Sequence, residues 1–239
     1  ADAGPIAFLR SGLLDRWREI YAPLPAPEAR PEFVRAGLPD PEGCFRVHGA
    51  GAFVILADLE RLGERPVPRG WADLFDARYR RDIALNGDRK GPQPLLLANL
   101  ARDFGAPALA ALGRNTHGLY GGGEMARAAG SARPDRAALS VLPWFWAGNN
   151  IHDARVRLVW PEEGAYCTPM VLLARRELTP GAAAALEFIT GPRWTERMES
   201  VRCVAADREH ARLPLPGALR WIGWSLARQD GALEALVAD

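Results

Sequence analysis

The chain has 239 residues, of which 48% are apolar, with 30 basic and 29 acidic side chains and a formal charge of +1. Because the charges of both signs are scattered along the whole length, no face is built to neutralise phosphates or to lie on anionic lipid. The composition therefore predicts a globular protein of one large or two smaller domains, and it excludes nucleic acid as the expected partner.

The three cysteines, Cys44, Cys167 and Cys203, are odd in number and far apart, with no CxxC motif. They indicate neither a disulfide framework nor a zinc knuckle, although a single Cys44–Cys203 bridge stays open. No run of about 18 apolar residues exists, so we expect no membrane span. The first residues lack the features of a signal peptide, but a cleaved signal leaves no trace.

The first predicted elements come before residue 63. Residues 6–21 have apolar side chains at helical spacing and run into the proline-rich stretch 22–33, which predicts a helix followed by a surface connection. Residues 43–63 then predict a strand, a glycine bend, a second strand over 53–57 and a short helix.

The next stretch predicts a helix with Trp71, Leu74 and Phe75 on one side, and then a buried strand over 82–85 that ends in an Asn-Gly-Asp turn. A helix follows from near Pro92 to Gly105, and another ends near Gly113.

The three glycines 121–123 lead into a predicted helix from about Glu124. Strands are expected at 138–142, 156–160 and 168–174, a helix with Thr179 as its N-cap, and a last helical segment after Pro216. Strands that alternate with helices predict an α/β fold.

Two glycine-rich motifs suggest ligand sites and carry competing interpretations. "HGAGAF" from His48 lacks the third glycine of a dinucleotide fingerprint and is followed by a strand, so a Rossmann site is not expected. "GGGEMARAAG" feeds a helix, which suits either an anion site or a plain loop.

No catalytic or metal-binding constellation is found. Glu162 and Glu163 are adjacent, which in an extended segment turns their side chains to opposite faces and makes a general acid/base pair a poor interpretation. The histidines form no HExxH pattern, and there is no GxSxG nucleophile elbow. We therefore expect no enzyme, no cofactor and no metal site.

The aromatic cluster Trp144, Phe145 and Trp146 stands beside Asn149 and Asn150 at the end of a predicted strand. In α/β proteins, ligands bind outside the carboxyl ends of strands. If the segment is extended, alternate rings face opposite sides, so both a binding role and a core role stay open.

The order of segments from Leu59 to Met198 resembles the extracellular solute-binding proteins of bacterial ABC importers, in the branch of ferric-iron binders. The resemblance rests on "RGWADLFDARYRRDIALNGD", on "WPEEGAY" followed by an apolar strand, and on "ALEFITGPRWTERM". It implies a type II two-lobed periplasmic-binding-protein fold with a ligand cleft between the lobes and closure on the ligand. Residues 1–56 and 165–239 would form the first lobe and 57–164 the second, with hinge strands near 53–58 and 160–169 and Gly164 as a hinge residue.

Two departures from the family pattern qualify this resemblance. Family members usually begin with a further strand, helix, strand unit, so the first lobe is expected to lack its N-terminal part, and a partner chain completing it stays open. Ferric binders place paired tyrosines where this chain has Trp144, Phe145 and Trp146, and neither ring type supplies a phenolate to a hard cation. We therefore expect a small organic or anionic solute, with ferric iron as the alternative.

The expected function is that of the substrate-binding component of an ABC importer in the periplasm, working with a permease. The alternative is a cytoplasmic sensor or enzyme on the same fold. The candidate ligand-binding residues are His48, Asn86, Asp88, Tyr120, Glu124, Trp144, Trp146, Asn149, Asn150, Tyr166 and Thr168.

Overall fold

The structure of the chain is a computed structural model that describes residues 19–24, 28–150, 153–229 and 235, without the side chain of Asn149. Most of the helix predicted over 6–21 lies outside the described residues. At its end, Tyr21–Ala22 form the short strand β1, which pairs antiparallel with β9, Ala174–Arg175.

The chain forms two compact units. Unit 1 comprises residues 1–51, 168–215 and 221–233, and unit 2 comprises residues 52–167, 216–220 and 234–239. The predicted first lobe ended at residue 56 and resumed at 165, whereas unit 1 ends at Gly51 and resumes at Thr168. Two strands carry the chain between the units, β2 (Arg46–Asp58) and β8 (Ala165–Leu172).

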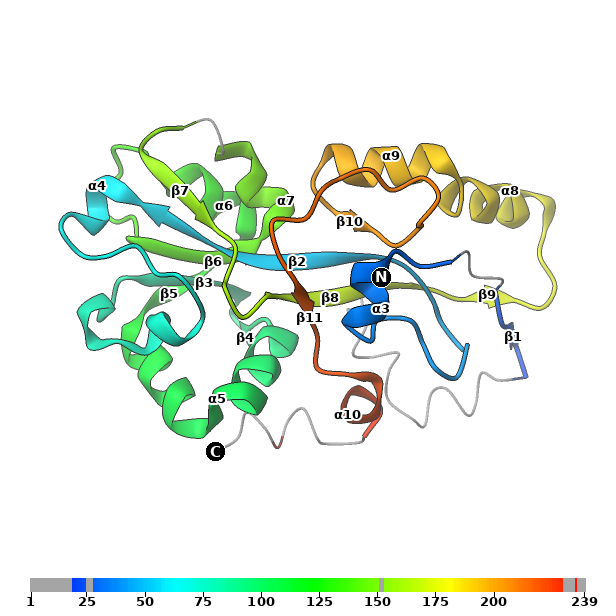
Figure 1. Cartoon of the computed structure of the whole chain (residues 1–239), viewed down its shortest axis with the longest axis horizontal. Coiled ribbons are helices and arrows are strands. Elements are labelled where there is room, and N and C mark those ends of the chain that lie inside the picture. The colour runs from blue at the N-terminus through cyan, green and yellow to red at the C-terminus, as the bar shows by residue number, and fades with distance from the viewer. Residues whose placement is uncertain (1–18, 25–27, 151–152, 230–234, 236–239) are drawn as a thin grey trace. The chain divides into compact units, whose positions relative to one another are not determined.

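Strand β2 is continuous, so the glycine bend predicted within residues 43–63 is wrong (Figure 1). Gly49 lies inside the strand, where a Cβ atom would come 2.1 Å from the Met198 Cε atom and 3.0 Å from the Val204 carbonyl oxygen. This glycine therefore serves close packing within unit 1, because a Cβ atom there would displace the Met198 side chain and crowd the Val204 carbonyl oxygen.

The sheet of unit 2 is built on three parallel strands. Strand β3 (Ile83–Asp88) lies between β5 (Thr116–Tyr120) and β6 (Leu139–Pro143) and runs parallel to both. The strand order is β11-β8-β2-β6-β3-β4, with β7 (Val156–Val159) also paired to β2. The remaining strands are β4 (Gly91–Pro92) and β11 (Leu219–Arg220), which is parallel to β8.

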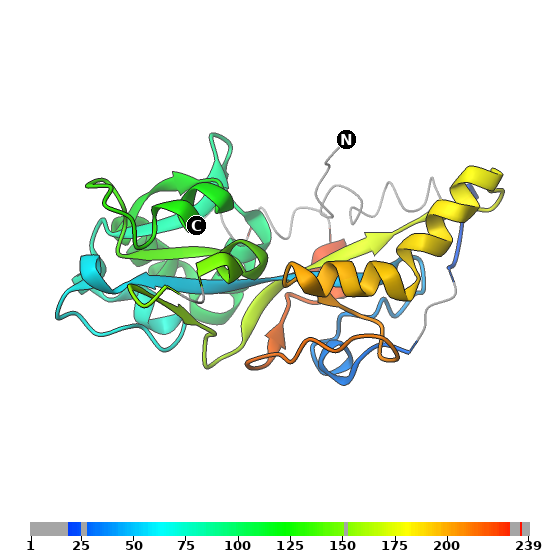
Figure 2. The same cartoon turned by 90° about the horizontal axis from the view of Figure 1, so that it is seen from above.

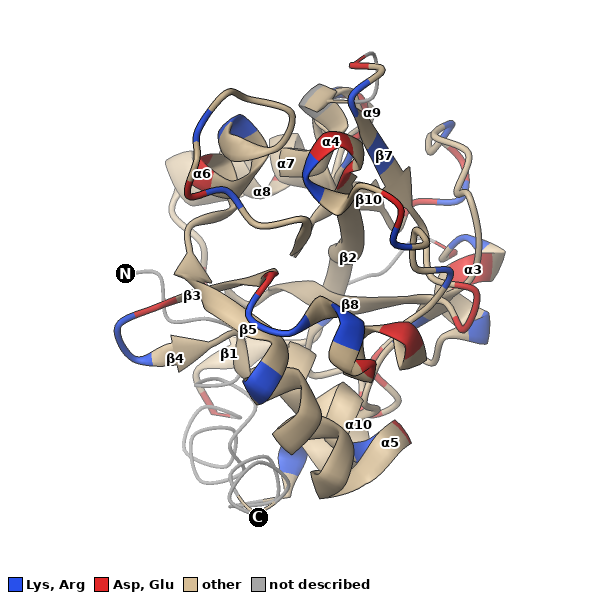
Figure 3. Ribbon diagram, turned by 90° about the vertical axis from the view of Figure 1, so that its left-hand side faces the viewer, with Lys and Arg blue, Asp and Glu red and all other residues tan. Residues whose placement is uncertain are grey.

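The Asn-Gly-Asp stretch is not the turn that the sequence predicted. Asn86 to Asp88 belong to β3, which forms a hairpin with β4, so the turn falls at Arg89 and Lys90. In Figure 3 the loop between β3 and β4 carries charges of both signs, and acidic and basic residues are interspersed elsewhere, as their scatter along the sequence predicts.

Helix α5 (Pro94–Asn115) confirms the prediction of two helices that meet at Gly105, which has φ 75° and ψ 175°. The first helix begins at Pro94 rather than near Pro92, and the second ends at Asn115. By length and composition α5 is apolar enough to cross a membrane. Its side chains Leu96, Leu100 and Leu112, however, pack in the core of unit 2, so it is a core helix.

The helix predicted around Trp71 is instead two 3₁₀ turns, Ala72–Phe75 and Ala77–Tyr79. The Asn115 amide donates to the carbonyl oxygens of Leu74 and Asp76, at 2.9 and 2.8 Å. These bonds satisfy carbonyl groups that an α-helix would have paired internally. The other helices of unit 2 are α4 (Leu59–Leu62), α6 (Gly122–Ala128), α7 (Trp144–Ala147) and the 3₁₀ turn Gly148–Asn150.

Unit 1 contains mostly short elements, apart from two consecutive helices, α8 (Pro180–Ile189) and α9 (Pro192–Ser200) (Figure 2). The predicted N-cap of α8 is confirmed, because the Thr179 hydroxyl accepts a hydrogen bond from the Ala182 N–H. The other described elements are α3 (Pro31–Arg35), β10 (Val204–Ala205) and α10 (Trp224–Arg228), which is the helical segment predicted after Pro216.

Candidate functional site

The carboxyl ends of the three parallel strands of unit 2 meet at one edge of the sheet. Asn86 of β3 is in register with Tyr120, the last residue of β5, and Leu85 is in register with Val141 of β6. The segments that follow these strand ends are the place where α/β proteins bind ligands. We refer to Asn86, Tyr120 and Trp146 as the strand-end cluster.

Asn86 and Tyr120 are held in place by hydrogen bonds. The side-chain amide of Asn86 donates to the backbone carbonyl oxygen of Tyr120 at 3.3 Å. The backbone carbonyl oxygen of Asn86 accepts from the Gln93 N–H at 3.0 Å. The Tyr120 hydroxyl lies 3.0 Å from His117 Nδ1, with the two rings stacked 5.8 Å apart. An amide and a phenol are thereby fixed at neighbouring strand ends.

The aromatic segment is helical, so the extended conformation considered for Trp144 to Trp146 is wrong. Trp144 is 3% exposed and packs edge-on against Trp160 at 5.2 Å, which makes it a core residue in this structure. Trp146 is 39% exposed and lies against Phe145 at 5.2 Å. Only the second of the two predicted indoles is accessible.

The glycine-rich loop before α6 accommodates Trp146. A Cβ atom at Gly122 would lie 2.2 Å from the Trp146 Cδ1 atom, and one at Gly123 would lie 3.1 Å from its Cζ3 atom. Helix α6 begins at Gly122, two residues before the predicted start at Glu124, and it has seven residues. Ring packing accounts for these glycines without an anion.

Asp88 and Asn150, two more of the predicted ligand-binding residues of unit 2, form hydrogen bonds with backbone groups. The Asp88 carboxylate accepts from the Lys90 N–H at 2.7 Å, and the Asn150 amide donates to the Ala126 carbonyl oxygen at 2.8 Å. Asn149 lies in the 3₁₀ turn after α7, and its side chain is outside the described part of the chain.

Tyr166 is buried and belongs to a polar cluster that the sequence analysis missed. Its ring stacks on Trp71 at 4.8 Å, and its hydroxyl donates to the Asp103 carboxylate at 2.7 Å. Asp103 also pairs with Arg102 at 2.7 Å and with Arg220 at 2.9 Å. Burial and the hydrogen bond to Asp103 raise the pKa of Tyr166, so the phenol stays protonated. Asp103, Tyr166 and Arg220 are far apart in sequence, and no local signal joins them.

Gly164 and the glutamates lie at the turn that enters β8. Gly164 has φ +104°, and its N–H donates to the Pro161 carbonyl oxygen at 2.8 Å. The Glu163 carboxylate accepts from the N–H groups of Trp71 and Ala72. Glu163 therefore caps the turn at 72–75, and Thr168 is the first residue of β8 in unit 1.

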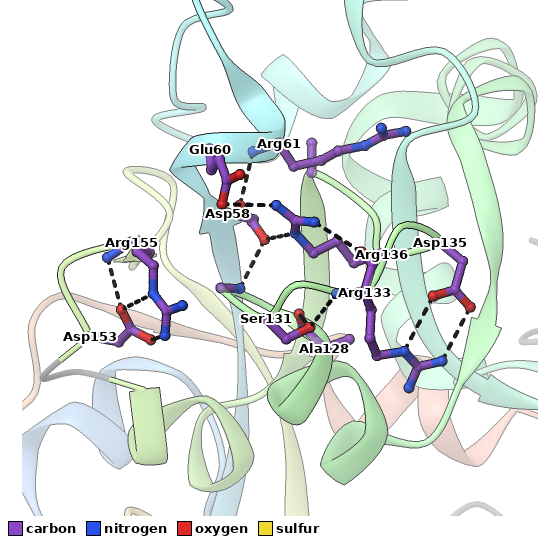
Figure 4. Close-up of polar contacts among 12 residues, drawn as sticks. Asp58, Glu60, Arg61, Ala128, Ser131, Arg133, Asp135, Arg136, Asp153 and Arg155 are labelled. Atoms are coloured by element: carbon purple, nitrogen blue, oxygen red, sulfur yellow. Dashed lines mark hydrogen bonds and ion pairs between the residues drawn. The ribbon is translucent and has the colours of Figure 1, made fainter.

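A cavity of about 20 Å³ lies beside α6 in unit 2, with His117, Tyr120 and Glu124 in its lining. That volume suits a single water molecule and is too small for a solute. Its wall at residues 133–137 is fixed by Asp58, which is fully buried and accepts from Arg136 Nε at 2.6 Å and from the Gly130 N–H at 2.9 Å (Figure 4).

In unit 1, His48 lines a larger cavity of about 380 Å³, a size typical of small-molecule pockets. The Trp194 indole N–H donates to His48 Nδ1 at 3.4 Å, and Phe33, Phe45 and Arg46 also line the cavity. Burial and the nearby Arg46 charge lower the pKa of His48 to about 4, so the imidazole is neutral at physiological pH. Trp194 was missed because it is remote from His48 in sequence.

Cys44, Cys167 and Cys203 form no disulfide bridge with one another, so the Cys44–Cys203 bridge left open above is not formed. Burial raises the pKa of Cys167, which makes its thiol inert at neutral pH. Within the described residues, no three His, Cys, Asp or Glu side chains are grouped so that they could hold a metal ion.

Comparison with known protein families gives a match for this chain. Residues 12–230 match the family described as bacterial extracellular solute-binding protein. The chain belongs to this family. No curated protein matches the chain by sequence.

Solved structures of solute-binding proteins have the same fold. The periplasmic binding protein AfuA from Actinobacillus pleuropneumoniae, with fructose-6-phosphate bound, aligns with a TM-score of 0.70 and 17% identity over 98% of this chain and 78% of its own. The ferric binding protein from Campylobacter jejuni aligns with a TM-score of 0.66 and 14% identity, over 95% and 78%.

A third relative is the spermidine/putrescine-binding protein PotD from Streptococcus pneumoniae, with a TM-score of 0.54 and 16% identity over 79% of this chain. The present chain spans 64% of that protein's length. The expected α/β fold of two-lobed periplasmic binding proteins is thus confirmed. The family consists of extracellular solute-binding proteins, so the comparisons give no support to the cytoplasmic alternative.

Proposed function

We propose that this chain is the substrate-binding component of an ABC importer that captures a small organic or anionic solute in the periplasm and delivers it to a permease. The proposal rests on the strand-end cluster of unit 2. Three parallel strands bring an amide, a phenol and an exposed indole to one edge. Amide and hydroxyl groups orient a polar solute through hydrogen bonds, and an indole face covers its apolar side.

The residue types favour an organic solute over ferric iron. The strand that ends at Pro143 is followed by tryptophan and phenylalanine, and neither supplies an anionic oxygen. Tyr120 is the one phenol of the strand-end cluster, whereas a hard cation such as ferric ion requires several oxygen ligands. We therefore rank ferric ion below sugar phosphates and other small polar solutes.

The mechanism that we propose is closure of the two units as the solute binds, with β2 and β8 as the connecting strands. His48 and its cavity supply a second group of candidate contacts in unit 1. Because His48 is neutral, it offers a hydrogen bond to the solute without a charge. No bond is made or broken in this mechanism.

Mass spectrometry of the small molecules released from the purified protein tests the proposal. We expect a stoichiometric organic or anionic compound that rebinds unchanged. Stoichiometric ferric ion in its place would overturn the choice of solute, and conversion of the rebound compound into a product would overturn the assignment as a binding protein.

A further inference from the structure

The cavity of about 380 Å³ that His48 lines belongs wholly to unit 1 and has mainly apolar walls. Phe33 and Val34 come from α3, Phe45 directly precedes β2, and Ile189 ends α8. Phe33 and Phe45 are buried, so packed core side chains bound the cavity. Aromatic and aliphatic walls around a space of this size suit a small molecule with a flat apolar body.

The hydrogen bond to Trp194 determines which nitrogen of His48 carries the proton. An indole N–H can only donate, so His48 Nδ1 accepts it at 3.4 Å and carries no hydrogen. The single proton of the neutral imidazole is therefore on Nε2. Among the described residues Nε2–H has no acceptor, yet the atom is not sealed from solvent. The imidazole thus offers one N–H donor in the wall of the cavity.

Thr195 of α9 provides a second hydrogen-bonding group in the same wall. The residue is 5% exposed, and its hydroxyl forms no hydrogen bond within the described part of the chain. A nearly buried hydroxyl without a partner is unfavourable, and an acceptor on a bound molecule would satisfy it.

The charged side chains in the cavity wall are matched by opposite charges. Asp40 pairs with Arg228 at 2.7 Å. Burial lowers the pKa of Arg46, and the charge of Asp207 opposes that shift. A charged ligand would add an uncompensated charge to these apolar surroundings, which is costly. The cavity therefore favours an uncharged ligand.

We propose that this cavity of unit 1 is a binding site for an uncharged, flat apolar molecule with a carbonyl-type acceptor, which His48 Nε2–H and the Thr195 hydroxyl recognise. The inference goes beyond the proposed function, because it gives unit 1 a ligand class of its own and needs no residue of the strand-end cluster. A solute that contacts this cavity on closure would do so through a group of the same class.

Fluorine nuclear magnetic resonance with the full chain tests the ligand class on three probes: para-fluoroacetophenone, para-fluorotoluene and para-fluorobenzoate. All three have the fluorinated ring, but only the first combines a carbonyl acceptor with zero charge. We expect para-fluoroacetophenone to bind saturably, para-fluorotoluene roughly tenfold more weakly for want of an acceptor, and para-fluorobenzoate at least as weakly because of its charge. Absence of para-fluoroacetophenone binding, or equal affinity for either of the other probes, would overturn the proposal.

Variants of the two polar groups test their roles. His48→Phe keeps an aromatic ring but loses the donor, so it should weaken para-fluoroacetophenone roughly tenfold and leave para-fluorotoluene unchanged. His48→Gln keeps both a donor and an acceptor for Trp194, and it should restore most of the affinity. Thr195→Val removes a hydroxyl without a partner, so it should fold as stably as the parent and still bind para-fluoroacetophenone several-fold more weakly. Unchanged affinity in both His48→Phe and Thr195→Val would contradict the recognition by these groups.

A blocking variant locates the probe in the cavity. Val34 is 59% exposed and also lines the cavity, so it lies at the rim, and Val34→Trp should obstruct entry without unfolding the chain. Val201, which is 40% exposed and outside the lining, gives the matched control Val201→Trp. We expect Val34→Trp to lose at least tenfold in affinity for para-fluoroacetophenone and Val201→Trp to bind like the parent. Equal binding by the two variants would overturn the site.

Trp146→Ala separates this inference from the proposed function. Trp146 lies in unit 2, so its removal should leave the binding of para-fluoroacetophenone unchanged. Loss of that binding in Trp146→Ala would assign the probe to the strand-end cluster and overturn the inference. A solute response that survives Trp146→Ala would instead contradict the proposed function alone.

Discussion

The Glu163 carboxylate accepts a hydrogen bond of 3.0 Å from the Trp71 backbone N–H, across 92 positions of sequence. A second oxygen accepts from the Ala72 N–H at 3.2 Å. Gly70 permits this approach, since a Cβ atom there would lie 2.1 Å from the carboxylate. Of the two glutamates in "WPEEGAY", Glu163 is thus a cap for the turn at 72–75 rather than a catalytic acid.

Replacing Glu163 by alanine should lower the free energy of unfolding by about 1–2 kcal/mol, because the half-buried Trp71 N–H loses its acceptor. Urea unfolding followed by circular dichroism measures the change. Glu162→Ala is the matched control and should stay close to the parent, since no hydrogen bond of the Glu162 side chain contributes to the cap. Equal losses in both variants would contradict the capping role.

The fit of Trp146 over Gly122 gives a second prediction. Gly122→Ala places a methyl group where the Trp146 ring lies, so the ring should shift, at a cost of about 1–3 kcal/mol. Near-ultraviolet circular dichroism reports the altered indole environment. Gly121→Ala is the neighbouring control, because a Cβ atom there meets nothing within 4 Å. A spectrum of Gly122→Ala identical to the parent would mean that Trp146 packs elsewhere.

Local signals in the sequence predicted the elements that local chemistry decides. Thr179 before Pro180 marked the start of α8, and Gly105 marked the break within α5. Both depend on backbone groups within a few residues, which a sequence pattern contains.

Long-range packing decided the elements that sequence reasoning missed. Gly49 suggested a bend, but it makes room for Met198 and Val204, which are distant in the chain. Asn86, Tyr120 and Trp146 are all among the predicted ligand-binding residues, whereas the neighbours that hold them in place, such as His117 for Tyr120, were not predicted. Trp144 is a core residue because it packs against Trp160, which lies 16 positions further along the chain. No local pattern in the sequence distinguishes Trp144 from the exposed Trp146.

The pKa of His48 predicts a pH dependence of stability. Burial and the Arg46 charge lower this pKa from 6.5 to about 4, so the unfolded chain binds the proton more tightly than the folded chain. The contribution of His48 to stability is therefore fully present above pH 6.5 and is lost as the pH falls from 6.5 toward 4.

Nuclear magnetic resonance titration of the imidazole measures this pKa directly. Arg46→Gln should move the midpoint upward, because one of the two causes of the shift is removed. His48→Gln should flatten the pH dependence of unfolding between pH 6.5 and 4. A titration midpoint near 6.5 in the parent would refute the assignment.

The left-handed conformation of Gly164 supports a further prediction. At φ +104° a side chain is strained, and a Cβ atom would lie 2.9 Å from the Arg220 Cγ atom and 3.1 Å from the Ala218 carbonyl oxygen. Gly164→Ala should therefore destabilise unit 2 by about 1–3 kcal/mol. Gly113→Ala is the contrast, because that glycine lies in α5 with nothing within 4 Å, and the change should stabilise by about 0.5–1 kcal/mol. Thermal unfolding that ranks Gly164→Ala equal to or above Gly113→Ala would be inconsistent with this strain.

The central claim is that a small organic or anionic solute binds at the strand-end cluster of unit 2, and a thermal-shift titration tests it most directly. The parent, Trp146→Phe and Trp146→Ala proteins are titrated with sugar phosphates, polyamines, small carboxylates and ferric ion. A solute at 100 times its Kd stabilises the folded chain by about 2.7 kcal/mol, which moves the midpoint measurably. We predict that an organic or anionic solute raises the midpoint of the parent and of Trp146→Phe, but not of Trp146→Ala. An undiminished rise in Trp146→Ala, or a rise with ferric ion alone, would contradict the claim.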